Sequence, residues 1–159
     1  MRLGEHAAVE LDDIDLHLLD LIQEDCRTSL VRLGEQVGLS APAVLERMKK
    51  LEAAGIVTGY HALVDGRRVG LDITAFIGVL ISHPTLIGDF ERQIVALPDV
   101  LECHHVTGEW NYLLKVRVHT TAELESLITN KLKTLRGVAR SSTVIVLTSP
   151  KETAVLPVR

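Results

Sequence analysis

Two short amphipathic segments of the chain are separated by only three residues, Gly38-Leu39-Ser40, and this spacing leaves few possible folds. The apolar residues of the first segment, residues 30–37, recur at helical spacing: Leu30, Leu33 and Val37. Thr28 or Ser29 can cap this helix, and Gly38 tolerates the left-handed conformation that ends it. Two helices joined by so short a turn are typical of a helix-turn-helix.

One further helix, which precedes the helix-turn-helix, completes a small N-terminal domain. Residues 11–22 repeat apolar positions at helical spacing, and Asp12 or Asp13 can cap that helix. The second helix of the turn begins after Ser40, has Pro42 in its first turn and closes at Gly55. Its inward stripe is Val44, Met48 and Leu51. Three helices are therefore predicted in about 45 residues.

The pattern changes to extended segments after Gly55, with a turn-rich boundary around residues 65–70. Beyond this boundary we predict strands over residues 71–82, 100–107, 110–119 and 138–148, and helices over 85–97 and 122–135, the latter capped by Thr121. Gly108-Glu109 forms the turn between the two middle strands. The βαββαβ order predicts a ferredoxin-like domain, so the fold class is α+β.

The charges are segregated along the chain. Residues 1–26 hold one basic and eight acidic residues, beginning with Arg2 and Glu5, whereas residues 27–50 hold five basic and two acidic residues. A local basic patch favours a polyanionic partner that meets one face. A solvated helical face has the same composition and is the alternative interpretation.

The sequence gives no indication of a membrane-spanning or secreted protein, or of a protein with a CxxC pair. The longest uninterrupted apolar run, residues 75–81, is too short to span a bilayer, and the N-terminus has no apolar block of signal-peptide length. We therefore expect a cytoplasmic protein with no membrane partner. Cys26 and Cys103 lie too far apart in sequence for a CxxC pair, and we expect two partly buried thiols.

No enzymatic motif is present either. The chain lacks GxGxxG, GxxxxGK[ST], HExxH and GxSxG. His104 and His105 are adjacent in a predicted strand, so they point to opposite faces and cannot chelate one metal, and Cys103 points away from His104. We predict core or interface histidines, no catalytic residue, no metal and no cofactor.

The helix-turn-helix is the positive indication of function. Its second helix lies in the major groove of DNA, with its start near base edges and its flanks near phosphates. The residues predicted to contact DNA are Arg27, Arg32, Ser40, Pro42, Ala43, Glu46, Arg47, Lys49 and Lys50. Arg47 borders the apolar stripe and can instead pin the helix to Glu24 or Asp25. The alternative is a three-helix protein-interaction domain.

Three stretches resemble the Lrp/AsnC (leucine-responsive, feast/famine) family of transcriptional regulators: LDDID at residues 11–15, LSAPAVLERMKKLEAAGIVTGY at 39–60 and VTGEWNYLLKV at 106–116. Arg27 adds to the resemblance, which extends from about Leu11 to Pro150. It implies a winged helix-turn-helix over residues 1–60, a hinge strand and linker over 61–70, a ferredoxin-like ligand-sensing and oligomerisation domain over 71–150 and a tail over 151–159.

The resemblance also implies an effector, usually an amino acid, bound between dimers. The residues it marks are His105, Val106, Thr107, Gly108, Glu109, Trp110 and Asn111 of one subunit, with Lys133 and Thr134 of a neighbour. The family often has Gly-Asp-aromatic-Asp at the turn. Here Asn111 keeps a hydrogen-bond acceptor without the negative charge that suits an α-ammonium group.

The sequence therefore predicts a homo-oligomeric regulator, a dimer that assembles to a tetramer or octamer and binds a roughly palindromic operator in double-stranded DNA, with half-sites about 10 base pairs apart or a multiple of that. An amino acid is the expected effector. One alternative is a sirohaem decarboxylase-like subunit, in which His104 or His105 is an acid and Arg117 or Arg140 anchors a carboxylate. Another is a ligand-sensing assembly module without DNA binding.

Overall fold

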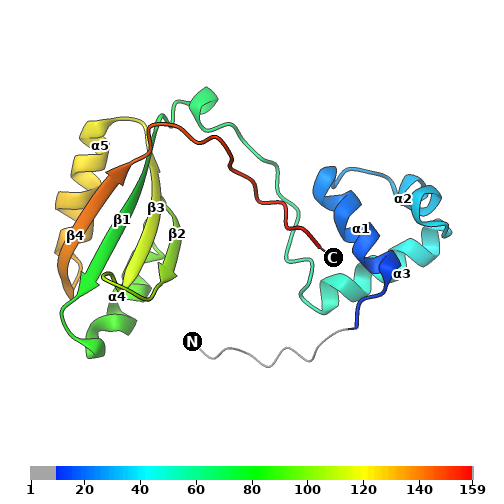
Figure 1. Cartoon of the computed structure of the whole chain (residues 1–159), viewed down its shortest axis with the longest axis horizontal. Helices are drawn as coiled ribbons and strands as arrows, with labels where there is room; N and C mark the ends of the chain where they lie inside the picture. Colours follow the sequence, from blue (N-terminus) through cyan, green and yellow to red (C-terminus); the bar gives the residue numbers. More distant parts are fainter. Residues whose placement is uncertain (1–9, 159) are drawn as a thin grey trace. The chain divides into compact units, whose positions relative to one another are not determined.

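The computed structural model describes residues 10–158; residues 1–9, where the acidic N-terminal segment begins with Arg2 and Glu5, and residue 159 lie outside the described part. It contains two compact units (Figure 1). We call residues 10–63 with 152–158 the N-terminal unit, and residues 64–151 the C-terminal unit. The segment after residue 151 thus groups with the helices at the opposite end of the chain.

The N-terminal unit consists of α1 (Asp13–Glu24), α2 (Leu30–Val37) and α3 (Ala41–Ala53). Asp12 caps α1 in a capping box, because its carboxylate accepts a hydrogen bond from the Asp15 backbone N–H and the Asp15 carboxylate accepts one from the Asp12 backbone N–H. Ser29 and Ser40 cap α2 and α3. The helix-turn-helix predicted from the sequence is confirmed.

The core of this unit is apolar and is built from all three helices: Leu18, Leu19, Leu33, Val44, Met48 and Leu51 are buried. Two glycines make the tight turn possible. Gly38 has φ 71°, which favours glycine, and a Cβ on Gly34 would lie 2.3 Å from the Leu39 carbonyl oxygen. The backbone of the turn can therefore approach α2 closely.

The predicted wing and hinge strand are not strands in the described residues between α3 and the sheet. Ile56 and Val57 donate backbone hydrogen bonds to the Leu51 carbonyl and close α3, and the chain then runs extended to a short 3-10 helix, Arg67–Val69. A wing needs a second strand to complete its hydrogen bonds, and none pairs with this segment within the described chain.

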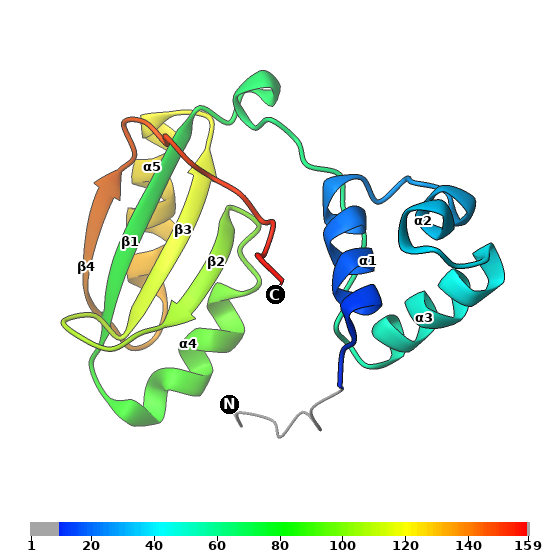
Figure 2. The same ribbon diagram turned by 45° about the vertical axis from the view of Figure 1, so that its right-hand side comes forward.

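The C-terminal unit is a four-stranded antiparallel sheet made of β1 (Ile73–Ile81), β2 (Val100–His105), β3 (Tyr112–Val118) and β4 (Val138–Ile145), in the order β2-β3-β1-β4. Two helices, α4 (Ile87–Ile94) and α5 (Thr121–Ser126), cover one face of the sheet (Figure 2). Short 3-10 helices, Pro84–Leu86 and Leu132–Thr134, and a π-helix, Leu127–Lys131, flank these helices. The βαββαβ order and the α+β class are confirmed.

The alternation predicted for β3 is confirmed, since Tyr112, Leu114, Val116 and Val118 are all buried. They pack with residues of β1, of α4 and α5, and of the π-helix and 3-10 helix that follow α5: Ala75, Ile77, Val79, Phe90, Ile94, Leu124, Leu127 and Leu132. The opposite face of the sheet carries no helix and exposes Phe76, Leu113 and Val144. Thr120, one residue earlier than predicted, caps α5.

The two cysteines are free thiols. Burial raises the pKa of Cys103, whereas Cys26 is exposed, so the expectation of two partly buried thiols is wrong for Cys26. Among the described residues no helix is long and apolar enough to cross a membrane.

Candidate nucleic-acid interface and effector loop

The outward face of α3 is polar and basic. Pro42, Glu46, Lys49 and Lys50 are exposed, while Val44, Met48 and Leu51 on the other side are buried. Lys49 lies 3.3 Å from the Glu46 carboxylate, a neighbour on the same helix face. Lys50 has no ion-pair partner within residues 10–158. The helix thus keeps a positive side chain available on its solvent face.

The start of α3 is a second feature of this face. The Ser40 hydroxyl accepts a hydrogen bond from the Ala43 backbone N–H at 3.4 Å. Pro42 in the first turn lacks an N–H and costs the helix no hydrogen bond there. The other free N–H groups of the first turn point out of the helix end, where they can donate hydrogen bonds to an anion such as a phosphate.

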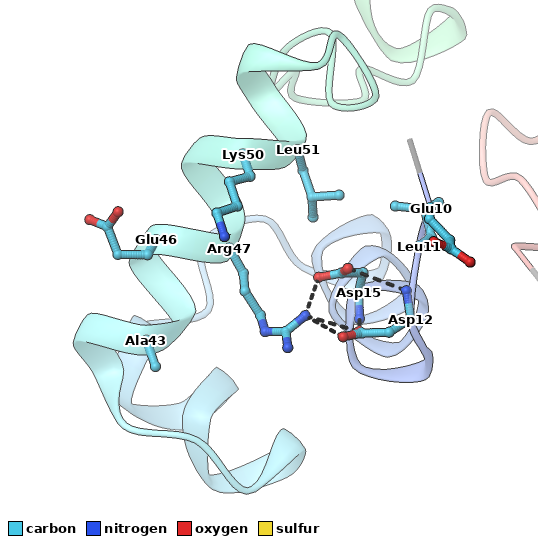
Figure 3. Close-up of a pocket in the computed structure, with 9 residues that line it drawn as sticks. All are labelled: Glu10, Leu11, Asp12, Asp15, Ala43, Glu46, Arg47, Lys50 and Leu51. Carbon is cyan, nitrogen blue, oxygen red and sulfur yellow. Dashed lines mark hydrogen bonds and ion pairs between the residues drawn. The ribbon is translucent and has the colours of Figure 1, made fainter. Parts of the chain in front are cut away.

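Arg47 has a different role from the lysines. Its Nη1 lies 2.8 Å from the Asp12 carboxylate and 2.7 Å from that of Asp15, so it links α3 to the capped start of α1 (Figure 3). The prediction that Arg47 pairs with Glu24 or Asp25 is wrong. Those residues lie at the other end of α1, and α3 crosses α1 near its N-terminus.

The electrostatics of this cluster are mutually favourable. The Asp15 backbone N–H, followed by the Arg47 guanidinium, lowers the pKa of Asp12, and the two carboxylates raise the pKa of Arg47. A hollow of about 470 Å³ opens beside them and is lined in part by Glu46, Lys50 and Leu51 (Figure 3). The charges at its base, Arg47, Asp12 and Asp15, pair with one another.

Two further predicted DNA contacts lie outside α3. Arg27, between α1 and α2, holds Asp25 at 3.1 Å, and backbone and side-chain hydrogen bonds from Arg27 lower the pKa of that carboxyl. Arg32 lies on α2 and is exposed. Both guanidinium groups are therefore on the surface of the N-terminal unit.

The predicted effector loop is a closed hairpin between β2 and β3. The Val106 N–H donates to the Asn111 carbonyl at 2.9 Å, and Gly108 has φ 112°, a conformation that favours glycine. Asn111 is committed to the sheet, because its Oδ1 accepts a hydrogen bond from the Ile81 N–H at 2.7 Å. Its backbone N–H donates to the Val79 carbonyl. Sequence reasoning considered Asn111 only as a ligand contact and missed this structural role.

The histidines beside the loop have separate environments. His105 stacks on Tyr112 with 4.9 Å between the ring centroids, and His104 lies 3.1 Å from the Glu102 carboxylate. Tyr112 donates to Glu91 of α4 at 2.7 Å, and burial, followed by this hydrogen bond, raises its pKa. No group of three possible metal ligands occurs among the described residues. The arrangement favours packing over catalysis.

Lys133 and Thr134 lie in the 3-10 turn after α5 and are exposed. The Thr134 hydroxyl donates to the Lys131 carbonyl at 2.7 Å and also lies 3.1 Å from the Asn130 carbonyl. Arg117, one of the two possible carboxylate anchors in the sirohaem decarboxylase alternative, donates a hydrogen bond to the Leu71 carbonyl. Thr134 and Arg117 therefore each have a structural hydrogen bond.

Comparison with known proteins identifies the family. A family model described as the AsnC-type helix-turn-helix domain matches residues 11–52, and one described as the Lrp/AsnC ligand binding domain matches residues 74–156. The chain belongs to the Lrp/AsnC family of transcriptional regulators. The helix-turn-helix of this family member is its DNA-binding part, as the resemblance implied.

Individual relatives agree over nearly the full length of the chain. A proline dehydrogenase transcriptional activator of Rhizobium radiobacter is 32% identical over 96% of this chain and 99% of its own. The leucine-responsive regulatory protein of Haemophilus influenzae is 34% identical over 90% of this chain and 87% of its own.

Solved structures of regulators have the same fold. A transcriptional regulator of Neisseria meningitidis in complex with L-Met superposes with a TM-score of 0.89 at 36% identity, covering 93% of this chain and 97% of that one. AsnC of Escherichia coli gives a TM-score of 0.86 at 26% identity, covering 91% and 97%.

Proposed function

We propose that this Lrp/AsnC family member binds a roughly palindromic operator as a homo-oligomer, with α3 of each N-terminal unit in the major groove. The observation that carries the proposal is the outward face of α3, which combines a capped, anion-accepting start with the ammonium group of Lys50, for which residues 10–158 offer no ion-pair partner. Two-fold symmetry sets the half-sites about 10 base pairs apart or a multiple of that.

The proposed DNA contacts are of two kinds, contacts to base edges and contacts to the phosphate backbone. Ala43, Glu46 and Lys49 face the base edges, because residues near the start of a recognition helix reach deepest into the groove. Ser40, Pro42 and Lys50 flank them, with Arg27 and Arg32 on the phosphates of either side. Arg47 positions α3 through Asp12 and Asp15 and so supports these contacts indirectly.

The effector in this proposal is an α-amino acid held by the hairpin from His105 to Asn111, with Lys133 and Thr134 supplied by a neighbouring subunit. The match to a ligand binding domain and the L-Met complex of the Neisseria meningitidis regulator support an amino acid as the ligand class. Binding regulates the protein by favouring one assembly state over another.

Assembly in this proposal uses the face of the sheet that carries no helix. Phe76, Leu113 and Val144 are exposed there, at 37%, 36% and 64%. An antiparallel sheet with one apolar face uncovered gains stability when a second copy covers it. The same surface on both copies gives a two-fold interface, which matches a palindromic operator.

Selection of bound duplexes from a random pool tests the DNA-binding proposal. We expect enrichment of a roughly palindromic sequence by the full-length protein, and loss of that enrichment in Lys50→Glu. Recovery of unenriched sequences by a folded, oligomeric protein would favour the assembly module without DNA binding. Titration of the twenty amino acids, followed by calorimetry, tests the effector separately.

A further inference from the structure

The chain passes between the two units twice, because the residues after the sheet return to the unit that contains α1 (Figure 1). We call the passage from α3 to the sheet the first connection, and the passage that follows β4 the second connection. The second connection ends in residues 152–158, which we call the C-terminal segment. The N-terminal unit is therefore joined to the sheet by two links instead of one.

The C-terminal segment is held on the N-terminal unit by two hydrogen bonds and an apolar contact. The Gln23 side chain accepts a hydrogen bond from the Leu156 N–H at 2.7 Å and donates one to the Leu156 carbonyl at 3.1 Å. Val158 packs on the apolar core of the same unit. A side-chain amide that binds both backbone groups of one residue fixes the position and the direction of that stretch of chain. The far end of the second connection is thus anchored.

The first connection is anchored at both of its ends. Near α3, the Tyr60 hydroxyl donates to the Glu52 carboxylate at 2.8 Å. Near the sheet, Arg117 Nε of β3 donates to the Leu71 carbonyl at 3.1 Å. The linker is therefore fastened to the unit on each side by a side chain of that unit.

The parts of the two connections that lie between these anchors are short. Residues 61–64 of the first connection and 147–151 of the second make no hydrogen bond within residues 10–158. Leu63 and Leu147 are 82% and 90% exposed, so packing does not hold these parts in place either. At about 3.4 Å per extended residue, they span at most about 14 Å and about 17 Å. Two short links anchored at separate points restrict rotations that a single link allows.

We propose that the second connection restrains the N-terminal unit relative to the sheet, and that this restraint fixes the half-site spacing that a dimer accepts in its operator. This inference rests on the proposed function. Bivalent binding gains affinity only when the geometry allows both sites to be engaged at once. Because B-DNA turns once in about 10 base pairs, two added base pairs rotate one half-site by about 70° relative to the other. An N-terminal unit held by two links follows this rotation less freely than one held by a single link.

The test lengthens the second connection in the full-length protein and leaves its anchors in place. A Gly-Ser insertion of about eight residues between Ser149 and Pro150 adds about 15 Å of slack. The matched control appends the same residues after Arg159, so that the composition is equal and the connection keeps its length. An unchanged Tm in both proteins shows that the added residues do not disturb the folding of the units.

Distance measurements by electron paramagnetic resonance detect the restraint without DNA. One spin label is placed on Cys26, an exposed thiol of the N-terminal unit, and one at Arg92→Cys on α4, in a Cys103→Ala background. Dilution with unlabelled protein limits the signal to label pairs within one chain. We expect the insertion to broaden the distance distribution by about twofold or more, whereas the control keeps the wild-type width.

The duplex recovered from the random pool gives the second measurement, after two base pairs are added between its half-sites. We expect this change to weaken binding by wild type about tenfold or more, and binding by the insertion variant about threefold or less. Gln23→Ala, which releases the C-terminal segment, should resemble the insertion variant. Glu24→Ala, at the exposed neighbouring position, should resemble wild type.

Each other outcome has a defined meaning. Wild-type distance widths and wild-type spacing dependence in the insertion variant overturn this inference and leave the proposed function intact. Broader distances with an unchanged spacing dependence also overturn it, since the restraint then has no role in recognition. If wild type enriches no duplex, the proposed function fails and the recognition part of this inference fails with it. The distance widths then decide the restraint alone: a broader distribution supports it and an unchanged one overturns it.

Discussion

Arg47 and Lys50 lie almost one turn apart on α3, yet the structure uses them differently. Arg47 bonds to Asp12 and Asp15, and its side chain is 28% exposed, whereas Lys50 is exposed and without an ion-pair partner among residues 10–158. We predict that Arg47→Ala lowers the free energy of unfolding of the N-terminal unit by about 1 kcal/mol, whereas Lys50→Ala changes it by less than about 0.5 kcal/mol. Chemical denaturation of both variants measures the difference.

DNA affinity separates the two residues further. Lys50→Ala weakens binding by loss of a phosphate contact and reduces its salt dependence. Arg47→Ala weakens binding through displacement of α3 and leaves the salt dependence close to that of wild type. A stable Arg47→Ala protein with reduced salt dependence would show that Arg47 contacts phosphate directly.

Asp12 gives the N-terminal unit a specific pH dependence. The Asp15 N–H and the Arg47 guanidinium hold its folded-state pKa below 3.8, so its interactions stabilise the fold above about pH 4 and are lost as the pH falls below that value. Asp12→Asn keeps an N-cap acceptor but removes the charge. We predict that the difference in Tm between wild type and Asp12→Asn is largest near pH 6 and shrinks toward about pH 2 to 3. A difference that is constant with pH would contradict an ionic role for Asp12.

Residue roles were predictable where the reason is local. Asp12, Ser29 and Ser40 cap their helices, and Gly108 has positive φ, because each depends on the backbone within three residues. The partner of Arg47 depends on where α1 and α3 cross, which no spacing along the chain reveals. Asn111 was likewise assigned to a ligand, because the N–H it binds comes from a strand thirty residues earlier.

At the scale of elements, the chain after β4 ends in a segment, residues 152–158, that is hydrogen-bonded to α1. The Gln23 side chain bonds twice to the Leu156 backbone, accepting from its N–H at 2.7 Å and donating to its carbonyl at 3.1 Å, and Val158 packs on the core of the N-terminal unit. We predict that truncation after Lys151 lowers the Tm of the N-terminal unit by several degrees, measured by calorimetry. Gln23→Ala has a smaller effect in the same direction.

The matched control for the Gln23–Leu156 hydrogen bonds is Glu24→Ala, a substitution at the exposed position next to Gln23 on α1. It leaves the Tm unchanged while Gln23→Ala lowers it. If truncation after Lys151 left the unfolding of the N-terminal unit unaltered, the segment would not stabilise that unit.

The elements themselves were largely predictable, because β3 alternates in polarity and the helices have clear caps. The wing and hinge strand were not, since a strand requires a hydrogen-bonding partner and the described chain supplies none to residues 56–66. Residues 122–135 have helical periodicity throughout, but the structure changes from α-helix to π-helix and then to 3-10 helix along them. Periodicity places the inward leucines without fixing the hydrogen-bond pattern.

At the scale of the whole molecule, the uncovered sheet face predicts association. We expect sedimentation at micromolar concentration to give a dimer or larger species, and Leu113→Lys to shift it toward monomer, because a charge in the middle of an apolar interface loses its hydration. Arg92→Ala, an exposed position on α4 and so on the other side of the sheet, should leave the dimer intact. A monomeric wild type would contradict the proposed symmetric recognition of DNA.

The most direct test of DNA binding through α3 is the slope of log affinity against log salt concentration on the duplex recovered from the random pool. We predict a steep negative slope for wild type, with weaker binding to a scrambled duplex of the same length, and a slope reduced in magnitude by about 0.9 in Lys50→Ala for the lost phosphate contact. Arg92→Ala, which removes a positive charge from α4 in the C-terminal unit, keeps the wild-type slope. Equal affinity for the two duplexes, or an unchanged slope in a folded Lys50→Ala protein, would contradict the account.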